Sequence, residues 1–196
     1  MTQKTDLRVL RTHKLIRNAL IELLEHKTFD KISVQDIVDT AMINRATFYK
    51  YYSGKSDLAG KMIAEVKAEY QKLMAILFYD ITAQEKSAQL TEERITFFAK
   101  MRPILPALFK IKTKRHHLYD DIFLSVKHTF IELAKQKNPK QDWDYHGEMF
   151  AHLLLHSVKR QLASGKLMPP AQMIGEWEAM LSVIKDLHPM GQNKPK

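Results

Sequence analysis

Cysteine is absent from the 196 residues, and glycine and proline are scarce, at six and seven. Without cysteine the chain can form no disulfide, thiolate metal site or cysteine nucleophile, which agrees with a reducing compartment. So few glycines and prolines leave little material for the turns of a β-sandwich or barrel, which favours a mainly helical chain. The sequence has no signal-peptide core and no apolar run of about 18 residues that could span a bilayer. These absences predict a cytoplasmic protein without a membrane partner.

Positive charge is unevenly distributed along the chain. Lys and Arg number 31 against 22 Asp and Glu, a net charge of +9. A basic balance of this size favours a polyanionic partner, either nucleic acid or an anionic membrane surface. Residues 1–60 hold ten Lys and Arg against seven acids, whereas residues 1–20 hold five against one and residues 44–55 hold three against none. The local balance is therefore more informative than the total.

The amino-terminal part is predicted to form three helices. Apolar residues at spacings of three and four form the stripe of a first helix that ends near His26. Ser33 and Asp36 have the spacing of a capping box, so a second helix should begin directly after Ser33. Asn44 is a good cap for a third short helix, which we expect to extend over residues 45–52.

The remainder of the chain is also predicted to be helical. Residues 80–90 are polar and are expected to form a connection, and no alternating strand pattern is visible. Breaks are marked by prolines and by Gly165. The expected helices lie at about residues 55–79, 91–101, 103–113, 117–137, 143–164 and 170–187.

The spacing within residues 33–55 is that of a helix-turn-helix. Phe48 would lock the second helix of this element onto the first, across a turn at Met42. The outward face of the second helix then holds cations, hydroxyls and no acid. Cations can bind phosphates or guanine edges, hydroxyls can bind phosphate oxygens, and Ala46 can contact a thymine methyl. Lys55, beside the positive end of the next helix, would add a phosphate contact.

Three stretches resemble the DNA-binding head of the TetR/AcrR family of transcriptional regulators: FDKISVQDI at 29–37, NRATFYKYY at 44–52 and KSDL at 55–58. The resemblance covers about residues 7–60. It implies an all-α homodimer whose heads enter successive major grooves of a palindromic operator, and a repressor released when a small-molecule effector binds the larger domain. The implied domains are a helix-turn-helix DNA-binding domain at 1–54, a helical effector-binding and dimerisation domain at 55–190, and a frayed tail at 191–196.

By position, the resemblance also assigns residues that contact double-stranded DNA. Phosphate contacts fall on Thr47, Tyr49, Tyr51 and Lys55. Base reading falls on Gln35, Arg45, Ala46 and Lys50. Met42 stands where the family commonly has glycine, so the turn must avoid a left-handed conformation or tolerate strain.

Two apolar stripes near the carboxyl end predict an antiparallel helix pair. The pair either completes the core of the monomer or also forms half of a four-helix dimer interface. The residues expected at such an interface are Leu154, Val158, Trp177, Met180, Leu181 and Ile184.

The middle of the chain is dense in phenylalanine and methionine. These side chains form a plain core, or some of them line an effector cavity with apolar walls. The residues expected around such a cavity are Met62, Met74, Phe97, Phe98, Met101, Leu105, Phe123, Met149 and His152.

Competing functions have less support in the sequence. The Gly-Lys-Ser at residues 54–56 lacks the earlier glycine and the preceding strand of a phosphate loop. Glu148, His152 and His156 share a helical face, but we expect them to line an interface or pocket wall, so neither a metal nor a cofactor is predicted. No nucleophile has a convincing base, so no enzyme is predicted. The alternatives are a helical protein acting at acidic membrane or protein surfaces, an enzyme built on a bundle, and a nonspecific DNA binder.

Overall fold

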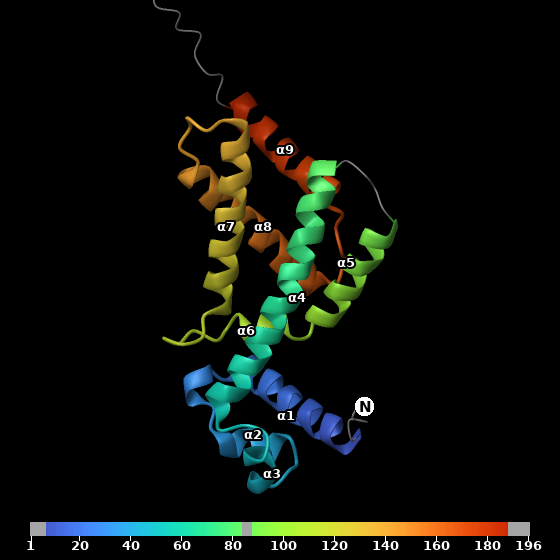
Figure 1. Cartoon of the computed structure of the whole chain (residues 1–196), viewed down its shortest axis with the longest axis vertical. Helices are drawn as coiled ribbons and strands as arrows, with labels where there is room; N and C mark the ends of the chain where they lie inside the picture. The colour runs from blue at the N-terminus through green and yellow to red at the C-terminus, as the bar shows by residue number, and fades with distance from the viewer. Residues whose placement is uncertain (1–6, 84–87, 188–196) are drawn as a thin grey trace, which may run out of the picture.

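The computed structural model describes residues 7–83 and 88–187, with the side chains of 73–91, 94, 170, 171 and 185–187 left out of the description. Within these ranges the chain forms nine α-helices and one 3₁₀ turn and contains no strand (Figure 1). A small head that contains the helix-turn-helix lies below a larger helical body. The prediction of an all-α fold with this division is confirmed. The expected frayed tail at 191–196 lies outside the described residues.

The head is built from three helices and the 3₁₀ turn. Their bounds are Leu7–His26 for α1, Phe29–Lys31 for η1, Val34–Thr40 for α2 and Arg45–Tyr49 for α3. Its core consists of buried apolar side chains from all of these elements, among them Ile16, Leu20, Leu24, Phe29, Ile37, Val38 and Phe48. Burial of each large apolar side chain contributes about 1.5–3 kcal/mol, which is how such short helices are held in place.

The recognition helix is shorter than the sequence predicts. The prediction extended this helix over residues 45–52, whereas α3 ends at Tyr49. The amide of Tyr51 donates to the carbonyl oxygen of Phe48, three residues back, at 3.0 Å. This tighter bonding is typical of a final helical turn, and the following Tyr52 side chain is buried.

The body contains the other six helices. Their bounds are Lys55–Ala83 for α4, Ala88–Met101 for α5, Leu105–Leu108 for α6, Leu118–Lys137 for α7, Asp144–Ser164 for α8 and Pro170–Leu187 for α9. The predicted connection over residues 80–90 is wrong in part, because α4 continues to Ala83 and α5 begins at Ala88. This stretch is polar but holds neither glycine nor proline, and polarity alone does not end a helix.

The expected helix at 103–113 is also wrong in length. Only Leu105–Leu108 is α-helical, and the amides of Lys110 and Ile111 donate to carbonyl oxygens three residues back. The three-residue bonding of Lys110 and Ile111 tightens the chain and ends the α-helix, whereas Pro103 and Pro106 lie before or within its first turn, where a missing amide costs no helical bond.

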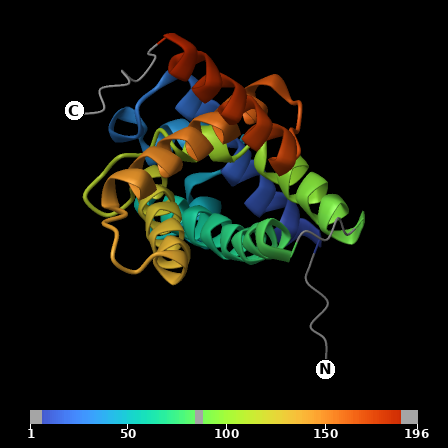
Figure 2. The ribbon, with the colours of Figure 1, turned by 90° about the horizontal axis from the view of Figure 1, so that it is seen from above.

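Helix α4 connects the head to the body (Figure 1). Seen from above, α8 lies between α4 and α9 (Figure 2), and the ring centroids of Phe150 in α8 and Trp177 in α9 are 5.9 Å apart. The α6 region contacts the head, since Lys110 Nζ donates to the carbonyl oxygen of Leu24 at 3.0 Å. His116 Nε2, in the loop before α7, lies 3.0 Å from the Oγ of Ser56 at the start of α4. Among the described residues no helix is long and apolar enough to cross a membrane.

Candidate nucleic-acid interface

Side-chain caps fix the starts of α2 and α3, as the sequence predicts. Ser33 Oγ accepts a hydrogen bond from the Asp36 amide at 3.0 Å, and Asp36 Oδ2 accepts one from the Ser33 amide at 2.8 Å. Lys27 Nζ lies 2.9 Å from Asp36, and the hydrogen bonds from Lys27 and Ser33 hold the pKa of this carboxyl well below its usual range. Asn44 Oδ1 accepts from the Thr47 amide at 3.1 Å. Each cap satisfies an amide that would otherwise lack a partner.

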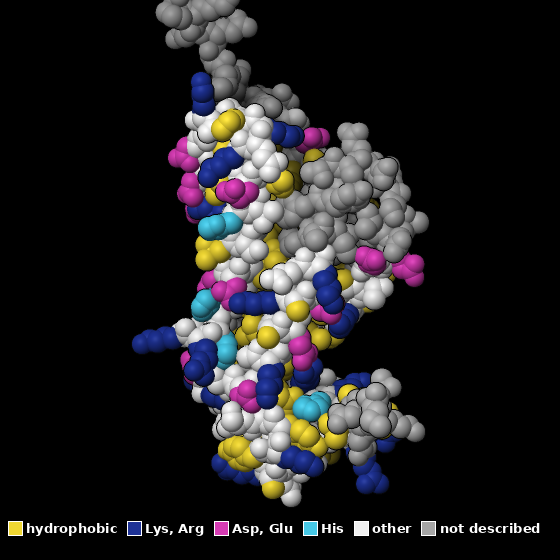
Figure 3. Space-filling model, in the orientation of Figure 1, with side chains coloured by type: hydrophobic (Ala, Val, Ile, Leu, Met, Phe, Trp, Pro, Cys, Tyr) yellow, Lys and Arg dark blue, Asp and Glu magenta, His cyan; other side chains and the backbone are white. Residues whose placement is uncertain are grey.

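The second helix of the motif turns one side inward and leaves the other to solvent. Phe48 and Tyr52 are buried, at 0% and 2% exposed, and the burial of Phe48 confirms its predicted inward direction. Of the eight residues predicted to contact DNA, those exposed are Gln35, Arg45, Ala46, Tyr49 and Lys50. Those half-buried are Thr47, Tyr51 and Lys55. In Figure 3, Lys and Arg side chains border the lower end of the head.

Two of the exposed residues are oriented by neighbours on the same helix. Arg45 donates from a terminal guanidinium nitrogen to the Tyr49 hydroxyl at 3.3 Å, and its guanidinium carbon lies 5.5 Å from the centre of that ring. Gln35 Nε2 donates to Asp39 at 2.8 Å. A guanidinium has five N–H groups and an amide carbonyl is a free acceptor, so both residues keep groups for a nucleic acid while their orientation is restricted.

The tyrosines that follow the recognition helix are tied to α1 through His13. Its Nδ1 lies 2.7 Å from the Tyr52 hydroxyl, and its ring centre lies 4.6 Å from that of Tyr51. Burial, together with Arg17 and Lys61, lowers the pKa of His13, which favours the neutral ring. Sequence reasoning missed this residue, because nothing in the local pattern of α1 indicates a contact so distant along the chain.

Lys55 occupies a position different from the predicted phosphate contact. Its ammonium group donates to the carbonyl oxygens of Phe29 at 2.9 Å, Asp30 at 3.0 Å and Ile32 at 2.6 Å. The same nitrogen lies 5.0 Å from the centre of the Phe29 ring. An ammonium has three N–H groups, so all of them are used by η1 and the residue after it. Contact of Lys55 with phosphate stays a prediction and would require release of these bonds.

The turn between α2 and α3 contains a left-handed residue. Met42 has a φ of 53° and its side chain is 93% exposed. Its amide donates to Asp39 and the Ile43 amide donates to Val38, so carbonyls at the end of α2 are satisfied. Of the two possibilities that the sequence leaves, the turn adopts the second and tolerates the strain.

Met42→Gly should therefore stabilise the protein. A left-handed conformation costs a residue with a Cβ about 1–2 kcal/mol, and the exposed Met42 side chain loses almost no packing when removed. We expect Met42→Gly to raise the free energy of unfolding by about 1 kcal/mol relative to Met42→Ala, measured by urea denaturation. Equal stability of the two variants would show that the turn is not strained.

Four of the nine residues predicted around an effector cavity line one of two separate hollows. Phe97 and Leu105 line an apolar cavity of about 70 Å³ between α4, α5, α7 and α8. Met62 and Met101 line a cleft of about 630 Å³ between head and body. Phe98 and Phe123 pack against the core, and the Met74 side chain lies outside the description.

Met149 and His152 line neither hollow. Met149 is 43% exposed, and the exposed His152 packs its ring against Phe123, with centroids 4.7 Å apart. In the part of the chain that the structure describes, no three His, Asp or Glu residues gather as metal ligands would. Glu148 instead lies 3.3 Å from Lys127 Nζ.

The residues predicted at a dimer interface also fall into two groups. Leu154 and Val158 line the small cavity of the body. Trp177 is half-buried and packs edge-on against Phe150. The exposed members, all on α9, are Met180, Leu181 and Ile184, at 45%, 49% and 52%.

Comparison with known proteins identifies the amino-terminal part. Residues 16–62 match the family model of the bacterial regulatory proteins, tetR family. The chain is 24% identical over 192 residues to the uncharacterized HTH-type transcriptional regulator YxbF of Bacillus subtilis (strain 168), a match that covers 93% of this chain and 48% of that protein. The HTH-type dhaKLM operon transcriptional activator DhaS of Lactococcus lactis subsp. lactis (strain IL1403) is 40% identical over 47 residues, 24% of this chain and 25% of that protein. The chain thus spans half or less of the length of these curated relatives.

Solved structures share the fold of most of the chain. A crystal structure of a gamma-butyrolactone receptor, described as ArpA-like, has a TM-score of 0.51 and 18% identity, and the match covers 83% of this chain and 80% of that one. A second structure with this description has a TM-score of 0.52 and 14% identity, covering 93% and 100%. At such identities the likeness establishes the fold.

The fold and the capped, acid-free recognition helix together define a helix-turn-helix protein. Its amino-terminal domain is a helix-turn-helix domain of the TetR family, and the resemblance found over residues 7–60 is confirmed. Proteins of this family are DNA-binding regulators rather than enzymes.

Proposed function

We propose that this chain is a sequence-specific DNA-binding transcriptional regulator of the cytoplasm. The observation that carries the proposal is the solvent face of α3, where Arg45, Tyr49 and Lys50 are exposed and no acid intervenes. The buried Phe48 holds this face in a fixed orientation. Cations and hydroxyls on a rigid helix are suited to the phosphates and base edges of the DNA major groove.

Each residue of the interface has a proposed role that follows from its chemistry. Hydroxyl groups on half-buried or oriented side chains can donate hydrogen bonds to phosphate oxygens from a fixed position. Exposed cations and amides can reach base edges, and a methyl group can meet thymine. The proposed phosphate contacts are Thr47, Tyr49 and Tyr51, and the proposed base-reading residues are Gln35, Arg45, Ala46 and Lys50.

The regulator is proposed to bind as a homodimer through α8 and α9. Large apolar side chains of α9 lie exposed, and a group of this kind on one helix is expected to be covered by another protein surface. Two-fold pairing of the bodies would place two heads on the half-sites of a palindromic operator, about 34 Å apart. The exposed apolar residues of α9 are Ile174, Met180, Leu181, Val183 and Ile184.

We further infer that the protein is a repressor that a small molecule releases from DNA by binding in the body. Tyr70 supports such a site, because it lines the apolar cavity and its buried hydroxyl, which lies near Ser125, makes no hydrogen bond of normal geometry with the described residues. Burial raises the pKa of Tyr70 to about 12, so it would serve as a neutral donor. The cavity of about 70 Å³ is smaller than the roughly 300–1,000 Å³ of ligand sites. An effector would therefore have to widen this cavity, and we propose that it does so by displacing α4, which leads into the head. The effector changes DNA binding only as far as it binds the widened state more tightly than the closed one.

Arg45→Ala tests the central proposal. An operator is first selected from fragments of genomic DNA with purified wild-type protein. We expect Arg45→Ala to weaken binding of the proposed dimer to that operator by at least about tenfold and to relax preference at one base pair in each half-site, because each lost base contact costs about 1–3 kcal/mol. Binding is measured by fluorescence anisotropy at fixed salt.

Lys140→Ala is the control, since Lys140 is an exposed cation in the loop between α7 and α8. It should leave both affinity and preference unchanged. If each of the three variants Arg45→Ala, Thr47→Ala and Tyr49→Phe bound the operator with wild-type affinity, the proposal would be contradicted. Binding of all three variants to anionic vesicles would then favour action at acidic membrane surfaces.

A further inference from the structure

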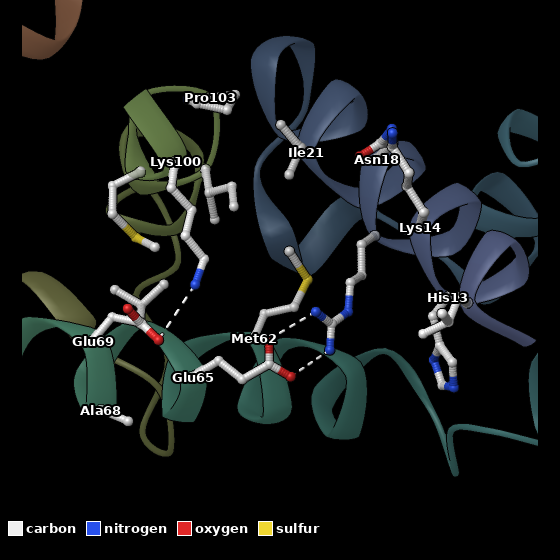
Figure 4. A pocket seen from close by; sticks show the side chains of 15 residues that line it. His13, Lys14, Asn18, Ile21, Met62, Glu65, Ala68, Glu69, Lys100 and Pro103 are labelled. Atoms are coloured by element: carbon white, nitrogen blue, oxygen red, sulfur yellow. Dashed lines mark hydrogen bonds and ion pairs between the residues drawn. The ribbon is translucent and has the colours of Figure 1, made fainter. Parts of the chain in front are cut away.

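A cleft of about 630 Å³ lies between α1 of the head and α4, the end of α5 and the following turn of the body. Figure 3 shows the molecule hollowed between head and body, and Figure 4 shows the lining from close by. The volume is within the range of small-molecule sites. None of the residues assigned to DNA lines it, and it is much larger than the cavity within the body.

The floor of the cleft is apolar and rigid. It includes Met62 and Val66 of α4 and Met101 at the end of α5, which are 4%, 3% and 2% exposed. Ile21 of α1 and Ile104 add further apolar surface. Side chains packed this tightly into a core change position little on binding, so an apolar ligand would find a preformed surface.

The rim of the cleft carries two ion pairs that Figure 4 marks. Both terminal nitrogens of Arg17 donate to Glu65, at 2.7 and 2.5 Å, and Lys100 Nζ lies 3.3 Å from Glu69. Hydrogen bonding to Glu65 raises the pKa of Arg17, and hydrogen bonding to Lys100 lowers that of Glu69. Each carboxylate of the rim is therefore already neutralised by a cation from across the cleft.

Two donors of the rim remain without partners. The Nε of Arg17 is buried and makes no hydrogen bond with any described residue. Lys14, one turn earlier on α1, is exposed and has no acidic neighbour at ion-pair distance in the described structure. A buried N–H without a partner is costly and marks a place where an acceptor is missing. With the acids paired, the surplus charge of the cleft is positive.

We propose that this cleft binds an amphipathic organic anion. The apolar part of the ligand lies on Met62, Val66 and Met101, and its carboxylate accepts a hydrogen bond from the exposed ammonium of Lys14, beside the positive charge of Arg17. The ligand contacts head and body at once, so its occupancy favours one angle between them. The binding stands by itself, whereas its effect on DNA rests on the proposed function.

Three probes of equal chain length distinguish the charge of the ligand: sodium octanoate, 1-octanol and octylammonium chloride. The full chain is labelled with ¹³C at its methionine methyl groups. We expect octanoate to shift the resonances of Met62 and Met101 and to leave Met42 and Met149, which lie outside the cleft, unmoved. 1-Octanol should bind about fivefold more weakly, because it lacks the charge, and octylammonium should produce no shift.

Lys14→Glu should weaken octanoate binding at least fivefold, whereas Lys140→Glu, with the same change of charge on another surface, should leave it unchanged. Both positions are exposed, so neither variant disturbs the core.

The proposed site is overturned if octanoate causes no shift at Met62 and Met101, or if octylammonium causes an equal shift. If octanoate shifts these resonances but leaves the affinity for the operator unchanged, the ligand site stands and only its proposed effect on the head is overturned. If the protein does not bind DNA even in the absence of octanoate, the proposed function is overturned and the ligand site stands.

Discussion

Leu181→Glu is expected to convert the proposed dimer to a monomer and to weaken operator binding by about two orders of magnitude, because the two heads would then bind independently instead of as a linked pair. Leu181 is 49% exposed at the middle of the unpartnered face of α9. A charge placed there would have to be desolvated in any interface. Light scattering gives the mass, and titration of operator DNA gives the affinity.

Leu124→Glu is the matched control for this experiment. Leu124 lies on α7 and is 51% exposed, so it undergoes the same chemical change at nearly the same exposure but outside α8 and α9. It should remain dimeric and bind the operator as the wild type does. A wild-type protein that stays monomeric at high concentration would contradict the proposed interface, as would a dimeric Leu181→Glu.

Lys55→Met is expected to lower the free energy of unfolding by about 3 kcal/mol. The substitution removes three charge-assisted hydrogen bonds and leaves the carbonyls of Asp30 and Ile32 without the Lys55 donor, while the Phe29 carbonyl keeps the bond from the Ile32 amide. Urea denaturation measures the loss. Lys50→Met, at an exposed position that donates to no carbonyl, should change stability by less than about 0.5 kcal/mol.

The salt dependence of DNA binding separates this structural role from the predicted phosphate contact. If Lys55 binds phosphate, Lys55→Met should retain stability and should reduce the slope of log K against log salt by about two, one for each subunit of the proposed dimer. If Lys55 only stabilises η1, Lys55→Met protein that remains folded should bind DNA with the same salt dependence as the wild type. A stable variant with a reduced slope would therefore restore the phosphate contact.

Features encoded within a few residues could be predicted from the sequence. The capping box of Ser33 and Asp36, the cap at Asn44 and the inward direction of Phe48 depend only on neighbours along the chain, and the structure has each of them. The same local signals identify the helix-turn-helix. The length of α4 was underestimated because a polar stretch without glycine or proline can continue a helix.

Features that depend on distant contacts could not be predicted in this way. The three carbonyls around Lys55 belong to η1 and the residue after it, and the hydrogen-bond partner of His13 lies 39 residues further along the chain. Helical periodicity shows that Met62 and Met101 face inward, but not that they face a cleft at the head rather than a cavity in the body. Which surfaces meet depends on how the helices pack, and periodicity within one helix carries no information about that.

Val66 lines both the cleft at the head and the cavity in the body. The two hollows therefore share one buried side chain of α4, and a ligand that widened the small body cavity by moving Val66 would narrow the cleft. Two ligands would then sense each other across a single residue, each weakening the other's affinity by the same factor. A protein of this design would respond to the ratio of two chemical signals.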